Sequence, residues 1–420
     1  MPIYHRGILY GNAEVRQVAA EGLGEMISLT AKKFLVGPFI VKTVGPLLRI
    51  VGKHNPPVVK IAIIKTLGLI LDKGAASLRA FVPQFQTTFV KSLLDPSRQV
   101  RIEAIKALAL LIPLSTRIDP LLKELISHAL GTGVNIPIES AGIVAIQTAS
   151  LDAISVVLFH GGKKVKLPES IPSALDTGKK MVEHDDEGVR EAAAKVIGIS
   201  CELLGKNITE KVVEDLILKN FVKDIDYVKH GKICCCYRIF SLPIANELGN
   251  DVTDKITNLV KDHMLHESSL VKEASCIAIG AVLGSAHDTL AILKLMQPNI
   301  ILCMDPKGNV EVLKSIALGL SIAVQMKPDI FDGSKGMKYL DAALRNSMRG
   351  SQRVQLTFND FLWLALNVDN GDAGLLKYVD LAMFDNVKAM KSLHSKVLSR
   401  MKHPNNHQVH SFHRYGTDSS

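Results

Sequence analysis

The sequence predicts an all-α fold, a superhelix of stacked helical hairpins, and three observations support that prediction. Hydrophobic residues make up 47% of the chain, whereas aromatic residues make up only 5%, with one tryptophan. Small and aliphatic side chains in this proportion favour closely packed helices over a β-sandwich. In addition, a short phrase recurs at a nearly constant interval, and we find no segment with the alternating pattern of a strand.

The recurring phrase is a valine, usually followed by a basic or polar residue, near the start of a helical pattern rich in Ala and Leu. Its copies are 39 to 45 residues apart and begin at Val15, Val59, Val100, Val144, Val189, Val228, Val271, Val310 and Val354. A helical repeat of about 40 to 45 residues is typical of HEAT and armadillo arrays. We therefore expect a HEAT/armadillo-type α-solenoid of about nine units over residues 1–402.

The clearest unit shows why such hairpins must stack. Its first helix should end at the Asp-Pro pair at 95–96, because proline cannot continue a helix. In its second helix, Val100 and Ala104 begin an apolar stripe at helical spacing. One hairpin cannot bury this stripe alone, so its neighbours must complete the core. The spacing of Asp95 and Arg101 also resembles the polar ladder that joins successive HEAT repeats.

Both ends of the array depart from the repeat. The chain opens on a helix of the second type, residues 12–28, and we expect no partner helix before it. The first unit should then be incomplete, with an exposed apolar face around Val15, Val18, Ala19 and Leu23. Residues 403–420 are polar and lack apolar periodicity, so we expect a disordered tail there.

The charge of the chain favours acidic partners. Its formal net charge is +9 and its pI is about 9.1, which suits nucleic acid or an acidic protein surface. We find no signal sequence, and the segment that we take as the most apolar helix, residues 274–286, is too short to cross a bilayer. We expect a cytoplasmic protein with no membrane partner.

The motifs of common enzymes are missing from the sequence. It has no phosphate-binding glycine loop after a strand, no nucleophile elbow and no zinc-protease motif. Its six cysteines lie in apolar helical patterns without a Cys-x-x-Cys pair, so we expect reduced, buried thiols. We therefore predict no catalytic residue, no metal, no cofactor and no small-molecule substrate. The protein should act by presenting a surface to other macromolecules.

Three phrases in the first hundred residues carry a family resemblance. They are Gly22–Ile27, Val44–Ile50 and Pro83–Leu93, of which the Pro-Gln-x-Gln-Thr-Thr-Phe run is the most specific. Together they resemble the C-terminal part of the general-control translational activators, which are large ribosome-associated HEAT-repeat proteins. The resemblance extends over nearly the whole chain and weakens from about residue 340 to 400.

The resemblance implies partners and the residues that bind them. Family members activate the amino-acid-starvation kinase that phosphorylates the α subunit of initiation factor 2, and this segment binds the N-terminal domain of that kinase. The matching residues here are Arg190, Lys229 and Lys232. A basic residue at the position of Arg190 also belongs to the repeat consensus, so a purely structural role is the alternative. The resemblance implies the ribosome as a second partner, bound in the family largely through repeats upstream of this segment.

Two other classes of function compete with this interpretation. A generic HEAT adaptor for nuclear transport or phosphatase assembly is one, although the basic charge and single tryptophan disfavour a transport receptor. A nucleic-acid-binding solenoid is the other, with Lys163, Lys164 and Lys166 as a phosphate-facing patch. Exposed lysines on a solvated loop are the simpler explanation of that patch.

Overall fold

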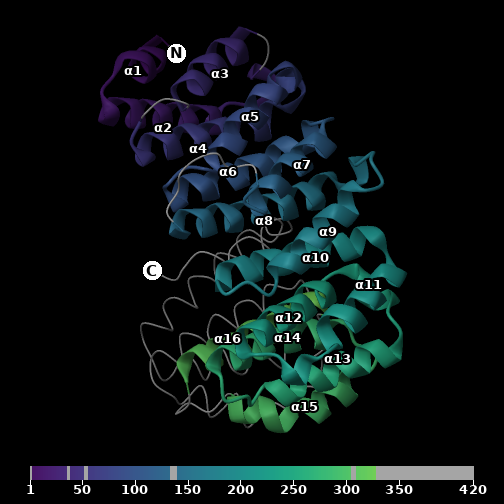
Figure 1. Ribbon diagram of the computed structural model, residues 1–420. Helices are drawn as coiled ribbons and strands as arrows, with labels where there is room; N and C mark the ends of the chain where they lie inside the picture. Colours follow the sequence, from purple (N-terminus) through teal and green to yellow (C-terminus); the bar gives the residue numbers. More distant parts are fainter. Residues whose placement is uncertain (1, 36–37, 52–54, 133–139, 304–308, 328–420) are drawn as a thin grey trace. The chain divides into compact units, whose positions relative to one another are not determined.

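The computed structural model describes residues 2–35, 38–51, 55–132, 140–303 and 309–327. Within these ranges the chain forms sixteen α-helices and no strand (Figure 1). The all-α prediction is therefore confirmed. The repeat expected at Val354 and the tail expected at 403–420 lie outside the described residues.

The chain divides into two compact units, Met1–Lys219 and Asn220–Ser420. Unit 1 contains five helical hairpins followed by α11 (Lys206–Val212). The first helices of its hairpins are α1 (Pro2–Tyr10), α3 (Pro38–Val51), α5 (Val82–Ser92), α7 (Ile118–Ala129) and α9 (Ser170–Met181). The second helices are α2 (Ala13–Leu29), α4 (Pro57–Gly74), α6 (Arg98–Leu111), α8 (Ser140–Gly161) and α10 (Glu187–Leu204).

Unit 2 continues the same pattern. It begins with α12 and then forms two hairpins, α13/α14 and α15/α16. The bounds are α12 (Asp226–Phe240), α13 (Asn250–His263), α14 (Ser269–Ser285), α15 (Thr289–Cys303) and α16 (Val310–Met326).

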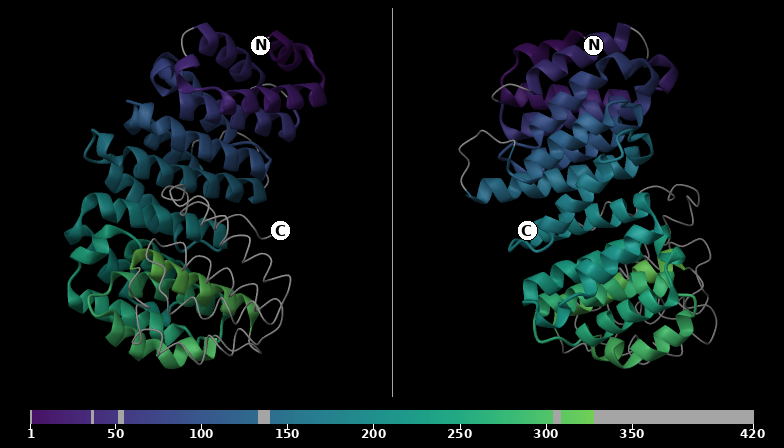
Figure 2. Two further views of the ribbon diagram at one scale, coloured as in Figure 1. Left: turned by 180° about the vertical axis from the view of Figure 1, so that it is seen from behind. Right: turned by 45° about the vertical axis from the view of Figure 1, so that its right-hand side comes forward.

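Within each unit, second helices pack on second helices in chain order. In unit 1 the series runs α2, α4, α6, α8 and α10, and in unit 2 it runs α12, α14 and α16 (Figures 1 and 2). Val100, Ala104, Leu108 and Leu111 of α6 are all fully buried, as the predicted stripe requires. Neighbouring hairpins thus complete one another's cores, which is the arrangement of an α-solenoid.

The N-terminal hairpin corrects one expectation. α1 precedes α2 and packs against it, so the prediction that α2 has no partner helix is wrong. Ile8 of α1 and Leu23 of α2 are fully buried, whereas Val15 and Val18 remain exposed. α1 has only nine residues, too few to show a helical period in the sequence. It is also shorter than a helix that is stable by itself, so it depends on packing against its neighbours.

α8 is the core helix of unit 1, and it corrects a second expectation. The segment Gly142–Lys164, not 274–286, is the one in the described chain that is long and apolar enough to cross a membrane. α8 packs against α6, α7 and α10, and half of its most apolar window is buried inside the fold. Core helices of helical repeats meet the same criteria, so this segment is weak support for a membrane span.

A close crossing of α14 and α16 in unit 2 depends on two glycines. A Cβ built at Gly280 of α14 would overlap the backbone of Gly319 of α16, and one built at Gly319 would overlap the carbonyl oxygen of Cys276. The obstacle on each side is backbone, which cannot turn aside as a flexible side chain can. Glycine is therefore required at both positions to let the two helices approach.

We predict that Gly280→Ala destabilises the protein by about 1–3 kcal/mol, because the added methyl group overpacks this crossing. Denaturant unfolding followed by circular dichroism measures the change. Gly68→Ala in α4 is the matched control, since its Cβ would meet only Leu110 at an ordinary 3.6 Å. That variant should be neutral or slightly more stable. Equal stability of wild type and Gly280→Ala would contradict the assignment.

Candidate functional site

Arg190, the first expected partner-binding residue, lies inside the fold of unit 1. Its side chain is only 2% exposed, and the preceding Val189 is fully buried. The guanidinium Nη1 donates to the carbonyl oxygens of His184 at 2.9 Å and Asp185 at 2.7 Å. Asp186 caps α10 from the same turn, since its side chain accepts from the Val189 N–H at 3.0 Å. Arg190 therefore fastens the turn between α9 and α10.

Arg101 makes the same contacts two repeats earlier. Its Nη1 donates to the carbonyl oxygens of Asp95 at 2.8 Å and Pro96 at 2.9 Å, and the residue is 9% exposed. In both repeats the arginine reaches back to the carbonyls six and five residues before it. The shared register indicates a structural role for both residues. Kinase binding through Arg190 stays a prediction, because the Arg190 guanidinium is buried and bonded to carbonyls of its own turn.

The two lysines expected to bind the partner, Lys229 and Lys232, lie in unit 2 and differ in burial. Lys232 is 4% exposed, and its Nζ pairs with Asp224 Oδ2 at 2.7 Å. Lys229, in the first turn of α12, is half-buried. Lys232 thus holds the turn before α12, whereas Lys229 keeps part of its surface exposed.

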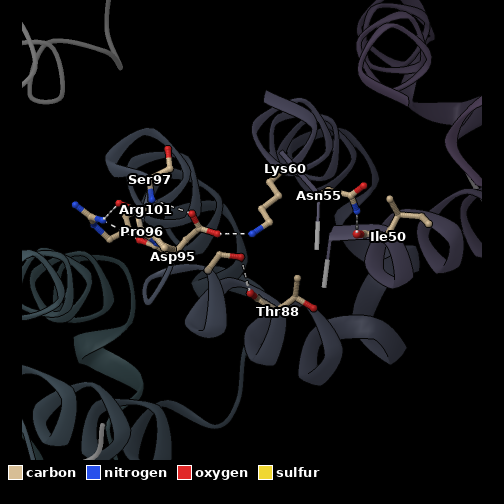
Figure 3. A network of polar contacts seen from close by, with 9 residues as sticks. Ile50, Asn55, Lys60, Thr88, Asp95, Pro96, Ser97 and Arg101 are labelled. Carbon is tan, nitrogen blue, oxygen red and sulfur yellow. Dashed lines mark hydrogen bonds and ion pairs between the residues drawn. The ribbon is translucent and has the colours of Figure 1, made fainter. Parts of the chain in front are cut away.

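The polar ladder between repeats uses other residues than the sequence suggested. Asp95 pairs with Lys60 of the preceding repeat at 2.6 Å, and it accepts from its own turn at the Ser97 N–H (Figure 3). One repeat earlier, Arg16 donates to Asn55 Oδ1 at 2.8 Å, and the Asn55 amide donates to the Ile50 carbonyl. The carboxylate of Asp95 therefore links neighbouring repeats through Lys60. Arg101 bonds the backbone carbonyl of Asp95 and not its carboxylate.

A groove of about 540 Å³ runs beside the Lys60–Asp95 pair. α3, α4 and α5 supply most of its walls through Leu48, Val51, Lys60, Pro83, Gln84, Thr87, Thr88, Lys91 and Ser92. Thr87 and Ser92 donate their hydroxyl protons to carbonyls of their own helix. The lining holds no histidine or cysteine and a single carboxylate, so this groove has no nucleophile paired with a base.

The basic loop after α8 divides into two kinds of lysine. Lys163, Lys164 and Lys166 are all exposed. Lys164 differs in that its ammonium bonds the carbonyl oxygens of Ile112 and Pro113, which follow α6. The backbone N–H groups of Lys166 and Leu167 both donate to Asp119, at 3.1 and 3.0 Å. Burial raises the pKa of Asp119, but the bonds from the Leu167 N–H, the Ser170 hydroxyl and the Lys166 N–H together lower it below its ordinary value. These bonds tie the loop to Asp119 in the first turn of α7.

Lys164 is one of three lysines that cap the C-terminus of a neighbouring helix, a feature that the sequence pattern did not predict. Lys73 bonds the carbonyl oxygens at the end of α2, including Ile27 at 3.1 Å. Lys327 does the same at the end of α14, bonding Ala286 O at 3.1 Å. Each lysine lies at the end of one second helix and caps the preceding second helix. A cation there compensates the partial negative charge of the helix C-terminus.

These features define a class of protein. The chain has the construction of a HEAT-type α-solenoid. Its hairpins stack, buried basic side chains hold the turns, and polar pairs join neighbouring repeats. Solved structures share the fold. Yeast importin-β Kap95p matches with a TM-score of 0.60 over 96% of this chain and 52% of its own, at 13% identity. Kap121p bound to Nup53p matches with a TM-score of 0.53 over 95% of this chain and 41% of its own, also at 13% identity.

Sequence relatives point to one family. Protein ILITYHIA of Arabidopsis thaliana is 31% identical over 67% of this chain, and the stalled ribosome sensor GCN1 of Mus musculus is 34% identical over 63%. The eIF-2-alpha kinase activator GCN1 of Saccharomyces cerevisiae is 32% identical over 52%. No family model matches. The resemblance to the general-control activators is thus confirmed, and the chain spans about a tenth of the length of these relatives.

We predict that Arg190→Ala lowers the free energy of unfolding by about 2–3 kcal/mol, because two buried carbonyl oxygens lose a charged donor. Arg101→Ala should have a similar effect, since its contacts are the same. Denaturant titration of each variant measures the loss, and the exposed Arg98→Ala is the control that should change little. An Arg190→Ala protein as stable as wild type would show that the clamp is not structural.

Proposed function

We propose that this chain is a non-catalytic binding module of a cytoplasmic translational regulator, and that it docks the kinase that phosphorylates initiation factor eIF2α. The proposal rests on the functions of the similar proteins. The relatives from Saccharomyces cerevisiae and Dictyostelium discoideum are eIF-2-alpha kinase activators, and those from Mus musculus and Homo sapiens are stalled ribosome sensors. A helical-repeat array suits this role because it offers an extended surface without needing a cleft.

The turns between helices are the surfaces best suited to such docking. Buried side chains hold them in place, namely Arg190 in unit 1 and Lys232 in unit 2. The side chains that these turns present are exposed, with Asp185 86% and Val222 87% accessible. A partner would obtain its binding energy from a few residues near such turns, and we assign direct contact to Lys229, which is half-buried in the first turn of α12. Arg190 and Lys232 would act indirectly by keeping the turns in shape.

We predict that Lys229→Glu weakens binding of the N-terminal domain of the initiation factor 2α kinase by about tenfold, because a contacting charge changes sign. Isothermal titration with purified proteins measures the affinity. Lys294→Glu in α15 is the matched control, an exposed lysine with the same charge change. It should bind as wild type does, and thermal melts should show both variants folded.

Arg190 provides a separate outcome in the same assay. Arg190→Ala should bind in proportion to its folded fraction, since its role is to hold the turn. Loss of binding by a fully folded Arg190→Ala protein would show instead that Arg190 contacts the partner. Equal binding by Lys229→Glu and wild type would contradict the assignment of Lys229.

The exposed lysines of the basic loop support a second candidate function, contact with RNA or the ribosome. Lys163 and Lys166 project from a loop whose backbone Asp119 ties down, so meeting phosphates would order the two side chains but would cost less backbone ordering. Lys164 is already engaged with the end of α6 and would not take part. The alternative of a nuclear-transport adaptor has less support, because the transport-receptor structures share only the fold.

We predict that the double variant Lys163→Glu/Lys166→Glu reduces retention on ribosomes at low salt, with the difference disappearing as salt is raised. Co-sedimentation over a series of salt concentrations measures this. Lys164→Glu is the informative control, since it should lower the melting temperature by opposing the helix C-terminus. A wild-type chain that does not sediment with ribosomes at low salt would end this candidate.

A further inference from the structure

Two cysteines of unit 2 touch each other in the core, away from every surface considered above. Cys276 lies on α14 and Cys303 is the last residue of α15, and their Sγ atoms are 3.6 Å apart. Cys276 is fully buried and Cys303 is 6% exposed. A disulfide bond has a length of about 2.05 Å, so a relative movement of about 1.5 Å would bring the two sulfurs to bonding distance.

Hydrogen bonds give the two thiols different roles. Cys276 donates its proton to the sulfur of Cys303, and Cys303 can donate to the carbonyl oxygen of Met264 at 3.4 Å. The bond from Cys276 lowers the pKa of Cys303 against the effect of burial, and the nearby charge of Lys272 acts in the same direction. The same bond, together with burial, raises the pKa of Cys276. Cys303 is therefore the thiol that ionises first.

Two other buried cysteines make a useful contrast. Burial raises the pKa of both Cys201 and Cys236 to about 12, so each remains a thiol at neutral pH. Cys236 donates to the carbonyl oxygen of Lys232, and no sulfur accepts from it in the contacts described. The thiolate is the reactive form of cysteine, so these two residues should resist oxidation.

We propose that Cys276 and Cys303 form a redox modification site, which hydrogen peroxide converts to a reversible disulfide. The Cys303 thiolate attacks one peroxide oxygen, the O–O bond breaks, and hydroxide leaves and is protonated to water. This leaves a sulfenic acid on Cys303. The sulfur of Cys276 then attacks that of Cys303, the S–O bond breaks, and hydroxide leaves as water with the proton of Cys276. Two thiols are oxidised and one peroxide is reduced to two waters.

The position of Cys303 gives the oxidant a route to the pair. The residue is 6% exposed, and local opening of the fold would uncover it further. Peroxide is small enough to enter through such an opening. Thiol reductants would reverse the bond by exchange.

The disulfide would fasten the place where three helices of unit 2 meet. It joins α14 to α15, and the carbonyl of Cys276 also borders Gly319 of α16 at the glycine crossing. Oxidation should therefore stiffen unit 2 and raise its melting temperature by about 5–10 °C. This inference stands apart from the proposed kinase docking and does not depend on it.

Peptide mapping of the full chain tests the proposal directly. Trypsin cleaves after Lys272, Lys294 and Lys307, which places the two cysteines in separate peptides, 273–294 and 295–307. After peroxide treatment and alkylation of free thiols, we expect these two peptides to be linked, and dithiothreitol to separate them. The melting temperature of the same samples should rise on oxidation and return on reduction.

Single variants identify the attacking sulfur. In Cys276→Ser, dimedone should label Cys303 as a trapped sulfenic acid, and in Cys303→Ser neither a disulfide nor a dimedone adduct should form at Cys276. Cys201→Ser is the matched control and should oxidise like wild type. The mapping of wild type needs no variant, so it decides the matter even if a serine variant fails to fold. Unlinked peptides, bonds to other cysteines, or dimedone on Cys276 would overturn the proposal.

Discussion

The structure depends on one constraint, that a hairpin of two short amphipathic helices cannot bury its apolar stripe alone. α6 illustrates it, since its buried residues contact α4 on one side and α8 on the other. Stability is therefore shared between neighbours, and each hairpin must hold the correct register to serve the next. The polar contacts at the helix ends maintain that register. Rungs such as Lys60–Asp95 act at one end of the second helices, and lysine caps such as Lys73 act at the other.

This construction determines where basic residues are available for binding. Arg101, Arg190 and Lys232 are charged, yet their nitrogens are occupied by carbonyls or a carboxylate inside the turns. Lys164 is similarly engaged at the end of α6. The net positive charge of the chain therefore overstates the charge that a partner can use. Lys163 and Lys166 are exposed and Lys229 is half-buried, with no charged partner described for any of the three, so they are the stronger candidates for contact.

The same construction links binding surfaces to fold stability. A turn presents its exposed side chains in a fixed arrangement only while the buried clamp behind it is intact. Substitution of a clamp residue would therefore reduce binding even though that residue touches no partner. A basic residue that is essential for function in such a repeat is thus not necessarily a contact residue. Stability and affinity have to be measured together to separate the two roles.

The sequence by itself determined the fold class, the repeat period and the family. The valine ladder at 39 to 45 residues and the stripe beginning at Val100 and Ala104 are local patterns, and local patterns decide which helices form. The sequence patterns did not predict α1, whose nine residues are too few to show a period. They also indicated residues 274–286 as the most apolar helix, whereas the segment long and apolar enough to cross a membrane contains α8.

Only the tertiary structure decided what each polar residue does. Lys60 meets Asp95, Lys164 meets the end of α6, and Cys276 meets Cys303, across separations of 27 to 52 residues. The sequence near Arg190 and Lys229 is alike, a valine followed by a base, yet Arg190 is 2% exposed and Lys229 is half-buried. Arg190 bonds carbonyls of its own turn, whereas pairings such as Lys60–Asp95 join separate repeats and leave no period in the sequence.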